Sequence, residues 1–295
     1  MPKPAFAILE DRAVIAVAGE DRTAFLQGLV SNDVERAGPE CAIYAAFLTA
    51  QGKYLHDFFI AVQGDAFLID CEAARRDDLL QRLSMYRMRS KVVVEPRPEL
   101  CVAAVFGAGA TEKLALGSER GAAAEIASGL AFVDPRLAAI GARALLPVDS
   151  AAAALKERGL TPATPEAYED ARLPLGLPDG SRDLIVGKSI LLENGFEELA
   201  GIDWDKGCFL GQELTARTRY RGLVKKRLVP VSVEGALPDP GTIIERDGRE
   251  AGEMRSGRGA HGLALLRLEA LENADEPLTA GDTRLAPQKP DWAAF

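Results

Sequence analysis

The alternation of short apolar runs with longer charged stretches constrains the fold more than any other feature of this chain. Residues 13–18 (AVIAVA) have the length and composition of a buried strand and end at Gly19. Residues 72–89 carry charges between leucines at helical spacing, which predicts a helix. A helix is also predicted from Glu20, and strands at residues 42–48, 54–62, 66–70, 91–95 and 100–106. This order predicts an α+β fold with antiparallel sheets rather than a doubly wound parallel sheet.

The second half of the chain predicts a different architecture. Thr164-Pro165-Glu166 is a helix start, with a capping hydroxyl, a proline at the first position and an acid next. We expect that helix to end near Arg172, and residues 174–200, rich in Gly and Pro, to form an irregular crossing segment. Short strands are predicted at residues 143–146, 228–233, 242–245, 249–254 and 261–267. The last four, with turns such as Asp-Gly between them, predict a small C-terminal β-barrel or sandwich.

Composition excludes several classes of protein. The net charge of −9 over 295 residues argues against a general nucleic-acid coat protein. The cysteines are Cys41, Cys71, Cys101 and Cys208, too far apart for a zinc or thioredoxin-type pair. No basic start followed by an apolar run opens the chain, and no stretch approaches the roughly 18 apolar residues of a membrane helix. We therefore expect a cytoplasmic protein with no resident metal and no membrane contact.

The segment with the most chemically capable side chains is residues 203–227. Its first half contains Lys206-Gly-Cys208-Phe-Leu-Gly211-Gln-Glu. Glycines let a backbone approach a ligand closely, and Lys206 together with a helix starting near Gly211 would favour the thiolate form of Cys208. The alternative is that Cys208 is one more small buried apolar residue. This half of the segment therefore predicts either a reactive thiol or a core residue.

The second half of that segment is strongly basic. Residues 217–227 contain six Lys or Arg and no acid. Such an excess could receive an anionic ligand, a phosphate backbone or an acidic protein. Arg219, Tyr220 and Arg221 would also suit stacking on a flat heterocycle or a base. The alternative is a basic face that contacts only solvent.

Residues 206–213 resemble the K-G-C-[YF]-x-G-Q-E signature of the YgfZ family. The continuation to Leu228 is especially similar to the branch that contains the mitochondrial iron–sulfur assembly factors. Further matches are residues 17–28 followed by Ser31-Asn32-Asp33, residues 49–53 (TAQGK) and residues 86–92 (YRMRSKV). The resemblance therefore covers most of the chain.

The YgfZ family in turn resembles the aminomethyltransferase, or T-protein, of the glycine cleavage system. That resemblance implies two α+β, ferredoxin-like units and a C-terminal β-barrel around a central channel, with tetrahydrofolate or a related reduced folate bound there. We expect residues 1–225 to form the folate-binding region, with its two units interleaved, and residues 226–295 to form the barrel. The elements predicted from the residues alone have the same composition.

The resemblance implies Cys208 as the catalytic residue and a folate site of stacking, pairing and basic side chains. The expected folate-binding residues are Asp57, Tyr168, Arg172, Lys206, Gln212, Glu213, Arg219 and Arg221. Two positions depart from the T-proteins. His56-Asp57 stands where they carry an acidic pair, and Pro174 stands where a glutamate holds the pterin. Whether the protein is an enzyme is therefore left open.

These observations predict a folate-binding accessory protein for iron–sulfur cluster assembly or repair, supporting enzymes that thiomethylate tRNA. Its expected partners are iron–sulfur proteins or cluster-assembly proteins. One alternative is a folate-dependent aminomethyl or one-carbon transferase, against which Pro174 counts. A second alternative is an RNA-binding tRNA-modification factor that works through residues 217–227. The net charge of −9 and the lack of a known RNA-reading motif count against direct RNA binding.

Overall fold

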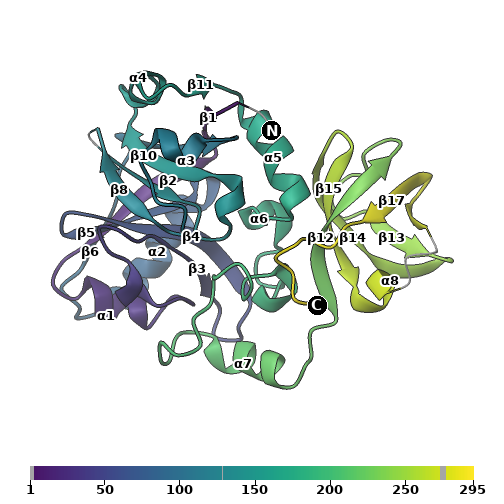
Figure 1. Cartoon of the computed structure of the whole chain (residues 1–295). Coiled ribbons are helices and arrows are strands. Elements are labelled where there is room, and N and C mark those ends of the chain that lie inside the picture. Colours follow the sequence, from purple (N-terminus) through teal and green to yellow (C-terminus); the bar gives the residue numbers. More distant parts are fainter. Residues whose placement is uncertain (1–2, 128, 273–276) are drawn as a thin grey trace. The chain divides into compact units, whose positions relative to one another are not determined.

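The structure, a computed structural model, describes residues 3–127, 129–272 and 277–295 (Figure 1). The chain divides into two compact units, which we describe separately. Unit 1 consists of Met1–Leu48, Leu55–Tyr168 and Leu199–Leu210. Unit 2 consists of Thr49–Tyr54, Glu169–Glu198 and Gly211–Phe295. In the described part of the chain, no helix is both long and apolar enough to cross a membrane.

Unit 1 contains a five-stranded sheet with the strand order β3-β4-β5-β2-β6. Its strands are β2 (Arg12–Ala18), β3 (Ile43–Leu48), β4 (Tyr54–Gln63), β5 (Ala66–Glu72) and β6 (Val93–Pro96). Gly64 and Asp65 form the tight turn between β4 and β5, and a Gly-Asp pair between two apolar runs is typical of such a hairpin. The helices of this part are α1 (Arg22–Gln27) and α2 (Arg76–Arg87), with short 3-10 turns η1 (Val34–Arg36) and η2 (Ala73–Arg75).

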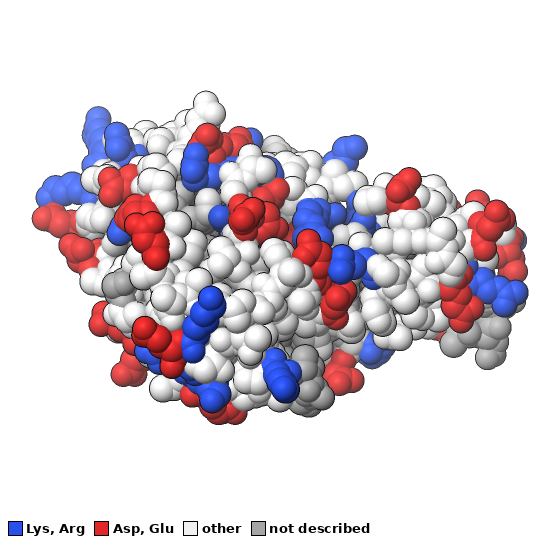
Figure 2. All heavy atoms as spheres, turned by 90° about the horizontal axis from the view of Figure 1, so that it is seen from above, with Lys and Arg blue, Asp and Glu red and all other residues white. Residues whose placement is uncertain are grey.

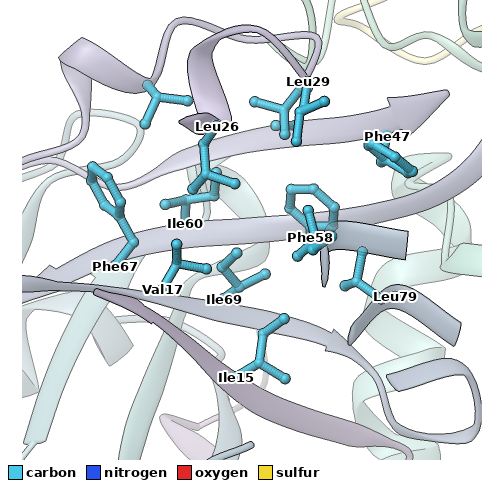
Figure 3. Packing of buried hydrophobic residues seen from close by; sticks show 14 of the residues in the cluster. Ile15, Val17, Leu26, Leu29, Phe47, Phe58, Ile60, Phe67, Ile69 and Leu79 are labelled. Atoms are coloured by element: carbon cyan, nitrogen blue, oxygen red, sulfur yellow. The ribbon is translucent and has the colours of Figure 1, made fainter. Parts of the chain in front are cut away.

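One face of this sheet forms the main core of unit 1. Ile15 and Val17 are two residues apart on β2, so both point to the same face, where they pair with Ile69 and Phe67 of β5. Leu26 of α1 belongs to the same cluster, whose side chains Figure 3 draws along the sheet. The other labelled members are Leu29, Phe47, Phe58, Ile60 and Leu79. Apolar burial by this alternating pattern is what fixes the register of the sheet.

A second sheet of unit 1 has the order β11-β1-β7-β10-β9-β8. Its strands are β1 (Ala5–Ile8), β7 (Leu100–Phe106), β8 (Ala123–Ile126), β9 (Gly129–Val133), β10 (Ala142–Pro147) and β11 (Thr161–Pro162). The short helices α3 (Ala110–Lys113) and α4 (Ala151–Glu157) and the turn η3 (Ala138–Ile140) connect them. Gly141 has φ +108°, and a Cβ there would lie 2.1 Å from the Val105 carbonyl oxygen, so the start of β10 requires glycine.

Unit 2 contains a closed six-stranded barrel, in the order β12-β15-β14-β13-β16-β17. Its strands are β12 (Lys226–Glu234), β13 (Ile243–Arg246), β14 (Arg249–Arg258), β15 (His261–Arg267), β16 (Leu278–Ala280) and β17 (Thr283–Pro287). Val229, Val231 and Val233 alternate along β12 and fill the interior. The remaining elements near or in this unit are α5 (Pro165–Arg172), η4 (Leu173–Leu175), α6 (Gly180–Asp183), η5 (Leu191–Asn194), α7 (Gln212–Tyr220) and α8 (Leu268–Glu272).

The predicted α+β class and the C-terminal barrel are confirmed. The helix predicted over residues 72–89 is shorter, because β5 continues to Glu72 and a 3-10 turn precedes α2. The strands β1, β8, β9, β11, β16 and β17 were not predicted. All six barrel strands lie within the expected domain 226–295, and the compact unit that contains the barrel also includes α7.

Candidate functional site

Cys208 lies in the loop before α7, and its side chain is exposed to solvent. The interpretation of Cys208 as a buried core residue is therefore wrong. The predicted helix does begin after Gly211, which has φ +84° at the N-cap of α7. An exposed thiol can meet a metal ion, a ligand or a partner protein without any rearrangement of the core.

Lys206 anchors this loop inside unit 1. Its Nζ donates hydrogen bonds to the carbonyl oxygens of Val30 at 2.7 Å and Asn32 at 2.5 Å. Its ammonium also lies 5.5 Å from the centre of the Phe209 ring, within the range of a cation–π contact. Lys206 therefore ties the Cys208 loop to the segment that follows α1. Its predicted roles in folate binding and in thiolate stabilisation stay predictions.

The Ser31-Asn32 segment holds the other end of the same chain section. Ser31 Oγ donates to the Gly201 carbonyl at 2.6 Å, and Asn32 Nδ2 donates to the Ala200 carbonyl at 2.8 Å. Both side chains are buried. The backbone N–H of Leu210 closes the section by donating to the Gly28 carbonyl at 3.1 Å. Sequence reasoning matched Ser31-Asn32 to a family pattern but gave it no role; in the structure these residues fix the Cys208-bearing segment from Ala200 onward.

Burial changes the titration of Lys206. Partial burial lowers the pKa of the Lys206 ammonium to about 8, against the opposing effect of the Asp33 and Asp203 carboxylates. The charged ammonium is therefore less favourable in the folded protein than in water. Lys206 still has donors for both carbonyls when it is neutral, because an amine keeps two N–H groups.

The first turn of α7 places Gln212 half-buried and Glu213 exposed. Glu213 accepts a hydrogen bond from Arg217 at 3.0 Å, one helical turn later. Such exposed pairs one turn apart stabilise a helix by a few tenths of a kcal/mol. No comparison or contact tests a folate contact for either residue, so both stay predictions.

Acidic side chains of unit 2 neutralise much of the basic segment 217–227. Arg219 Nε lies 2.6 Å from Glu197 Oε1, and Arg227 Nη1 lies 3.0 Å from Glu198 Oε1. Lys226 pairs with Glu250 at 3.8 Å. Arg221, at the C-terminal cap of α7, is exposed. The local excess of charge seen in the sequence is therefore smaller in the folded unit. Figure 2 shows basic and acidic side chains interspersed over the face it draws.

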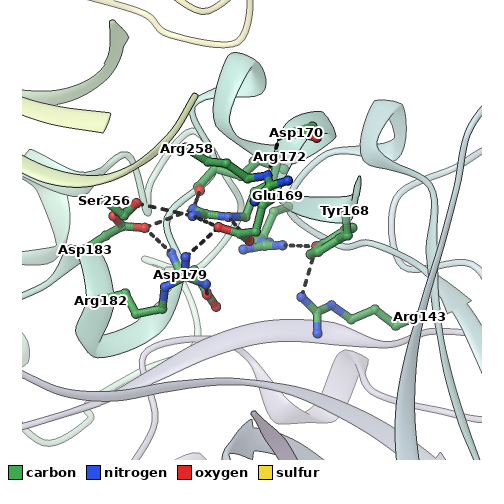
Figure 4. A network of polar contacts seen from close by, with 12 residues as sticks. Arg143, Tyr168, Glu169, Asp170, Arg172, Asp179, Arg182, Asp183, Ser256 and Arg258 are labelled. Atoms are coloured by element: carbon green, nitrogen blue, oxygen red, sulfur yellow. Dashed lines mark hydrogen bonds and ion pairs between the residues drawn. The ribbon is translucent and has the colours of Figure 1, made fainter. Parts of the chain in front are cut away.

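Arg172 is buried and bonded on every side within unit 2 (Figure 4). Its guanidinium pairs with Glu169 at 2.8 Å and Asp183 at 2.9 Å, and donates to Ser256 Oγ at 3.3 Å and to the Leu177 carbonyl at 2.5 Å. Burial raises the pKa of Asp183, with Arg172 opposing that effect. These bonds use the donors that a folate carboxylate would need, so the contacts favour a structural role for Arg172.

Tyr168 is buried in unit 1 beside two buried arginines. Its hydroxyl accepts from Arg143 Nη2 at 3.3 Å and from Arg136 Nη2 at 3.5 Å. Its ring lies 5.7 Å from the ring of Phe106, with the two planes tilted by 57°. A pterin could stack on Tyr168 only if these neighbours moved, so the stacking role stays a prediction that the contacts do not favour.

Asp57 and His56 point to different partners from adjacent positions on β4. Asp57 is buried and accepts a hydrogen bond from the Tyr44 hydroxyl at 2.8 Å. His56 is also buried, with Nε2 2.8 Å from an Asp78 carboxylate oxygen. Burial, with the charge of Arg75, lowers the pKa of His56 to about 4, so the ring is neutral at physiological pH. Both side chains are therefore shielded from solvent, unlike a catalytic acid or base on an open surface.

A small cavity in unit 2 lies beside α7. It is lined by Gln51-Gly52-Lys53, residues 190–192, Leu214, Thr215 and Thr218, and its volume is about 170 Å³. Cavities that hold drug-sized ligands measure roughly 300–1,000 Å³, so this one does not accommodate a whole folate. Within the described ranges, no group of three or more His, Cys, Asp and Glu is placed to hold a metal ion.

Comparisons with known proteins match the C-terminal barrel by itself and nearly the whole chain. Residues 225–295 match the family model described as the CAF17 C-terminal beta-barrel domain. The mitochondrial iron–sulfur cluster assembly factor IBA57 of Mus musculus is 36% identical over 96% of this chain and 84% of its own length. Its counterpart in Homo sapiens is 35% identical, with the same coverage of 96% and 84%.

Among solved structures, the chain resembles the glycine cleavage system aminomethyltransferase T from Bartonella henselae. The TM-score is 0.79 at 14% identity, and the match covers 98% of this chain and 86% of that one. At this identity the likeness shows the fold alone, and it confirms the predicted T-protein-like fold.

The relatives also correct one prediction. They are named as mitochondrial proteins, which contradicts the cytoplasmic location predicted above. That prediction rested on the lack of a secretory pattern, which bears on secretion only and does not distinguish one intracellular compartment from another.

Proposed function

Because the chain belongs to the family of the iron–sulfur cluster assembly factor IBA57, we propose that it acts in iron–sulfur cluster assembly. The observation that carries this proposal is the exposed Cys208 on a loop anchored by Lys206. Thiolates are the protein ligands that iron and iron–sulfur clusters prefer. We propose that Cys208 binds iron or sulfur transiently or takes part in thiol redox chemistry.

A single cysteine cannot hold a stable cluster alone. The other three cysteines are half-buried or buried. Any cluster bound through Cys208 therefore takes its remaining ligands from a second molecule, either a cluster-assembly protein or an iron–sulfur client. Enzymes that thiomethylate tRNA are the client class that the YgfZ-like motif suggests.

We further propose tetrahydrofolate or a related reduced folate as a ligand. This rests on the motif Lys206–Glu213, on its YgfZ resemblance and on the T-protein-like fold, which is compatible with a folate protein without establishing one. The same fold likeness favours a one-carbon transferase as a second candidate. Pro174 stands against transfer, because a proline cannot pair with the donor and acceptor atoms of a pterin as a carboxylate can.

Calorimetry with tetrahydrofolate under reducing conditions tests the folate proposal. We expect binding to the wild type and to Cys208→Ser alike, since the thiol is not required to hold a pterin. If neither protein binds tetrahydrofolate, the resemblance to the T-protein is one of fold alone. A titration with single-stranded RNA tests the remaining alternative, because binding through several phosphates weakens steeply with salt.

Rescue of cells depleted of their own IBA57 tests the cluster-assembly proposal. We expect the wild-type chain, directed to mitochondria, to restore the activity of the host's iron–sulfur enzymes, and Cys208→Ser not to restore it. Cys101→Ser is the matched control, because that thiol is half-buried and donates to the Leu146 carbonyl at 3.5 Å. Full rescue by Cys208→Ser would overturn the proposal.

A further inference from the structure

The end of α2 and the strand that follows it expose an apolar and basic surface of unit 1. We call it the α2 surface, and it consists of Met85, Tyr86, Arg87, Met88, Arg89 and Val93. Met88 is 88% exposed, Met85 65% and Val93 54%. The opposite side of α2 supplies Leu79 and Leu83 to the core. Met85, Met88 and Val93 stay exposed instead. Grouped exposed apolar residues of this kind mark interaction sites.

The α2 surface is held in place before any partner arrives. Tyr86 packs edge-on against Phe47, with ring centres 5.9 Å apart. After the helix, Ser90 N–H donates to the Arg87 carbonyl at 2.8 Å, and Lys91 N–H donates to an Asp21 carboxylate oxygen at 2.7 Å. A preformed surface loses less conformational entropy on binding than a mobile one.

Met88 adds backbone strain to this surface. Its φ is +43° with ψ −106°, a region that side chains other than glycine rarely adopt. Strain of this kind costs roughly 1–3 kcal/mol and persists where the surroundings impose it, often at functional sites. Met88 is also the most exposed apolar side chain of the surface. Neither its strain nor its exposure stabilises the fold.

The charge of the α2 surface indicates what it contacts. Residues 79–94 contain four Lys or Arg and no acid, in a chain of net charge −9. Arg82 pairs with Asp78 and Lys91 with Glu20. Arg87 and Arg89 are exposed, and neither forms an ion pair within the described part of the chain. Two cations beside apolar side chains are complemented by carboxylates beside apolar side chains.

We propose that the α2 surface docks a partner protein whose contact face combines carboxylates with apolar side chains. Met, Tyr and Arg are the residue types enriched in interface cores and hot spots. Pairing of two copies about a two-fold axis would bring Arg87 and Arg89 close to their own copies, which disfavours self-association. RNA would leave Met85, Met88 and Val93 without apolar partners. The surface goes beyond the proposed function, since docking does not require Cys208.

Binding of a defined probe tests this proposal on the full chain. The probe is a fluorescein-labelled helical peptide of leucine, alanine and glutamate. Its binding to the full chain is measured by fluorescence anisotropy at low salt. We expect Arg87→Glu with Arg89→Glu to weaken binding by about tenfold or more. Val148→Glu is the matched control, because Val148 is 55% exposed on the same unit, and its affinity should stay within about twofold of the wild type.

Met88→Gly separates docking from folding. Glycine relieves the strain at φ +43°, so this variant should unfold at a higher temperature and yet bind the probe several-fold more weakly. Cys208→Ser should bind like the wild type, so failure of docking is distinguishable from failure of the cluster-assembly proposal. Three outcomes overturn the proposal: unchanged affinity in the Arg87 and Arg89 variant, equal affinity for a glutamine version of the peptide, or preference for single-stranded RNA over the peptide.

Discussion

In the Cys208 loop the thiol is exposed while the backbone is anchored. In the Arg172 network the central side chains are buried and bonded to one another. Lys206, Ser31 and Asn32 form the anchor of the first region. Glu169, Asp183 and Ser256 saturate the second. Both regions are rich in polar groups, but only the first offers one to an incoming molecule.

The difference teaches that the exposed family motif is available for function, whereas the buried network serves stability. A buried charge must be paired. All five N–H groups of Arg172 are bonded within unit 2, so this side chain has no donor left for a ligand. An exposed thiol contributes little to stability, so selection for folding does not explain its surroundings. Substitutions at single residues test this division.

Arg172→Met should destabilise unit 2 by about 3–5 kcal/mol, because it leaves the buried Asp183 carboxylate without its cation. Chemical denaturation followed by fluorescence measures the change. Arg182→Met is the control, since that arginine is 44% exposed and its pairs with Asp179 and Glu169 should contribute about 1 kcal/mol or less. Equal and small losses in both variants would contradict a structural role for Arg172.

His56 should make the wild type lose stability in acid. Its folded pKa, lowered from 6.5 to about 4 by burial and by Arg75, means that the unfolded chain takes up the proton first as pH falls. Stability is therefore lost between pH 6.5 and 4, by up to about 3 kcal/mol. His56→Gln should lack this part of the pH dependence in denaturation curves. A pH profile identical to the wild type would show that His56 is accessible and titrates normally.

Lys206 should change the stability of the wild type at alkaline pH. Its folded pKa of about 8 lies below the ordinary 10.5, so the folded state disfavours the charged ammonium. The free energy of unfolding should rise between about pH 8 and 10.5 in the wild type, relative to Lys206→Met. Lys206→Met should also lose about 1–3 kcal/mol at pH 7, because the Val30 and Asn32 carbonyls lose their donor. A flat difference over this pH range would mean that Lys206 is solvated, not anchored.

Cys208→Ser should have the smallest effect on stability, within about 0.5 kcal/mol, because the exposed side chain has no packing to lose. The same denaturation assay measures it. Loss of several kcal/mol would reinstate the interpretation of Cys208 as a core residue and remove the contrast with Arg172.

The sequence predicted most of the elements that rest on strong local patterns. The apolar runs of β2 and β7, the hairpin at Gly64-Asp65 and the proline start of α5 all carry their own signals. The strands β1 and β16 have only four and three residues. β1 forms through pairing with β7, about a hundred residues away, and no local pattern indicates such pairing. β16 pairs with its neighbour β17, and three residues are too few to show the alternation that predicts a strand.

Of the candidate site, only the sequence motif around Cys208 could be predicted, not the contacts that hold it. Cys208 and the helix start at Gly211 follow from glycine placement and the resemblance. The internal bonding of Arg172 could not be foreseen, because Asp183 and Ser256 are 11 and 84 residues away along the chain. The same holds for the anchor of Lys206, whose acceptors lie 176 and 174 residues away.

Reaction of the folded protein with a coloured disulfide reagent tests most directly whether the anchored loop presents Cys208. We predict one fast thiol, absent in Cys208→Ser. The others should react slowly: Cys41 is half-buried, burial raises the pKa of Cys101, and burial raises the pKa of Cys71 to about 12. A fast phase that survives in Cys208→Ser, or the lack of any fast thiol in the wild type, would contradict the account.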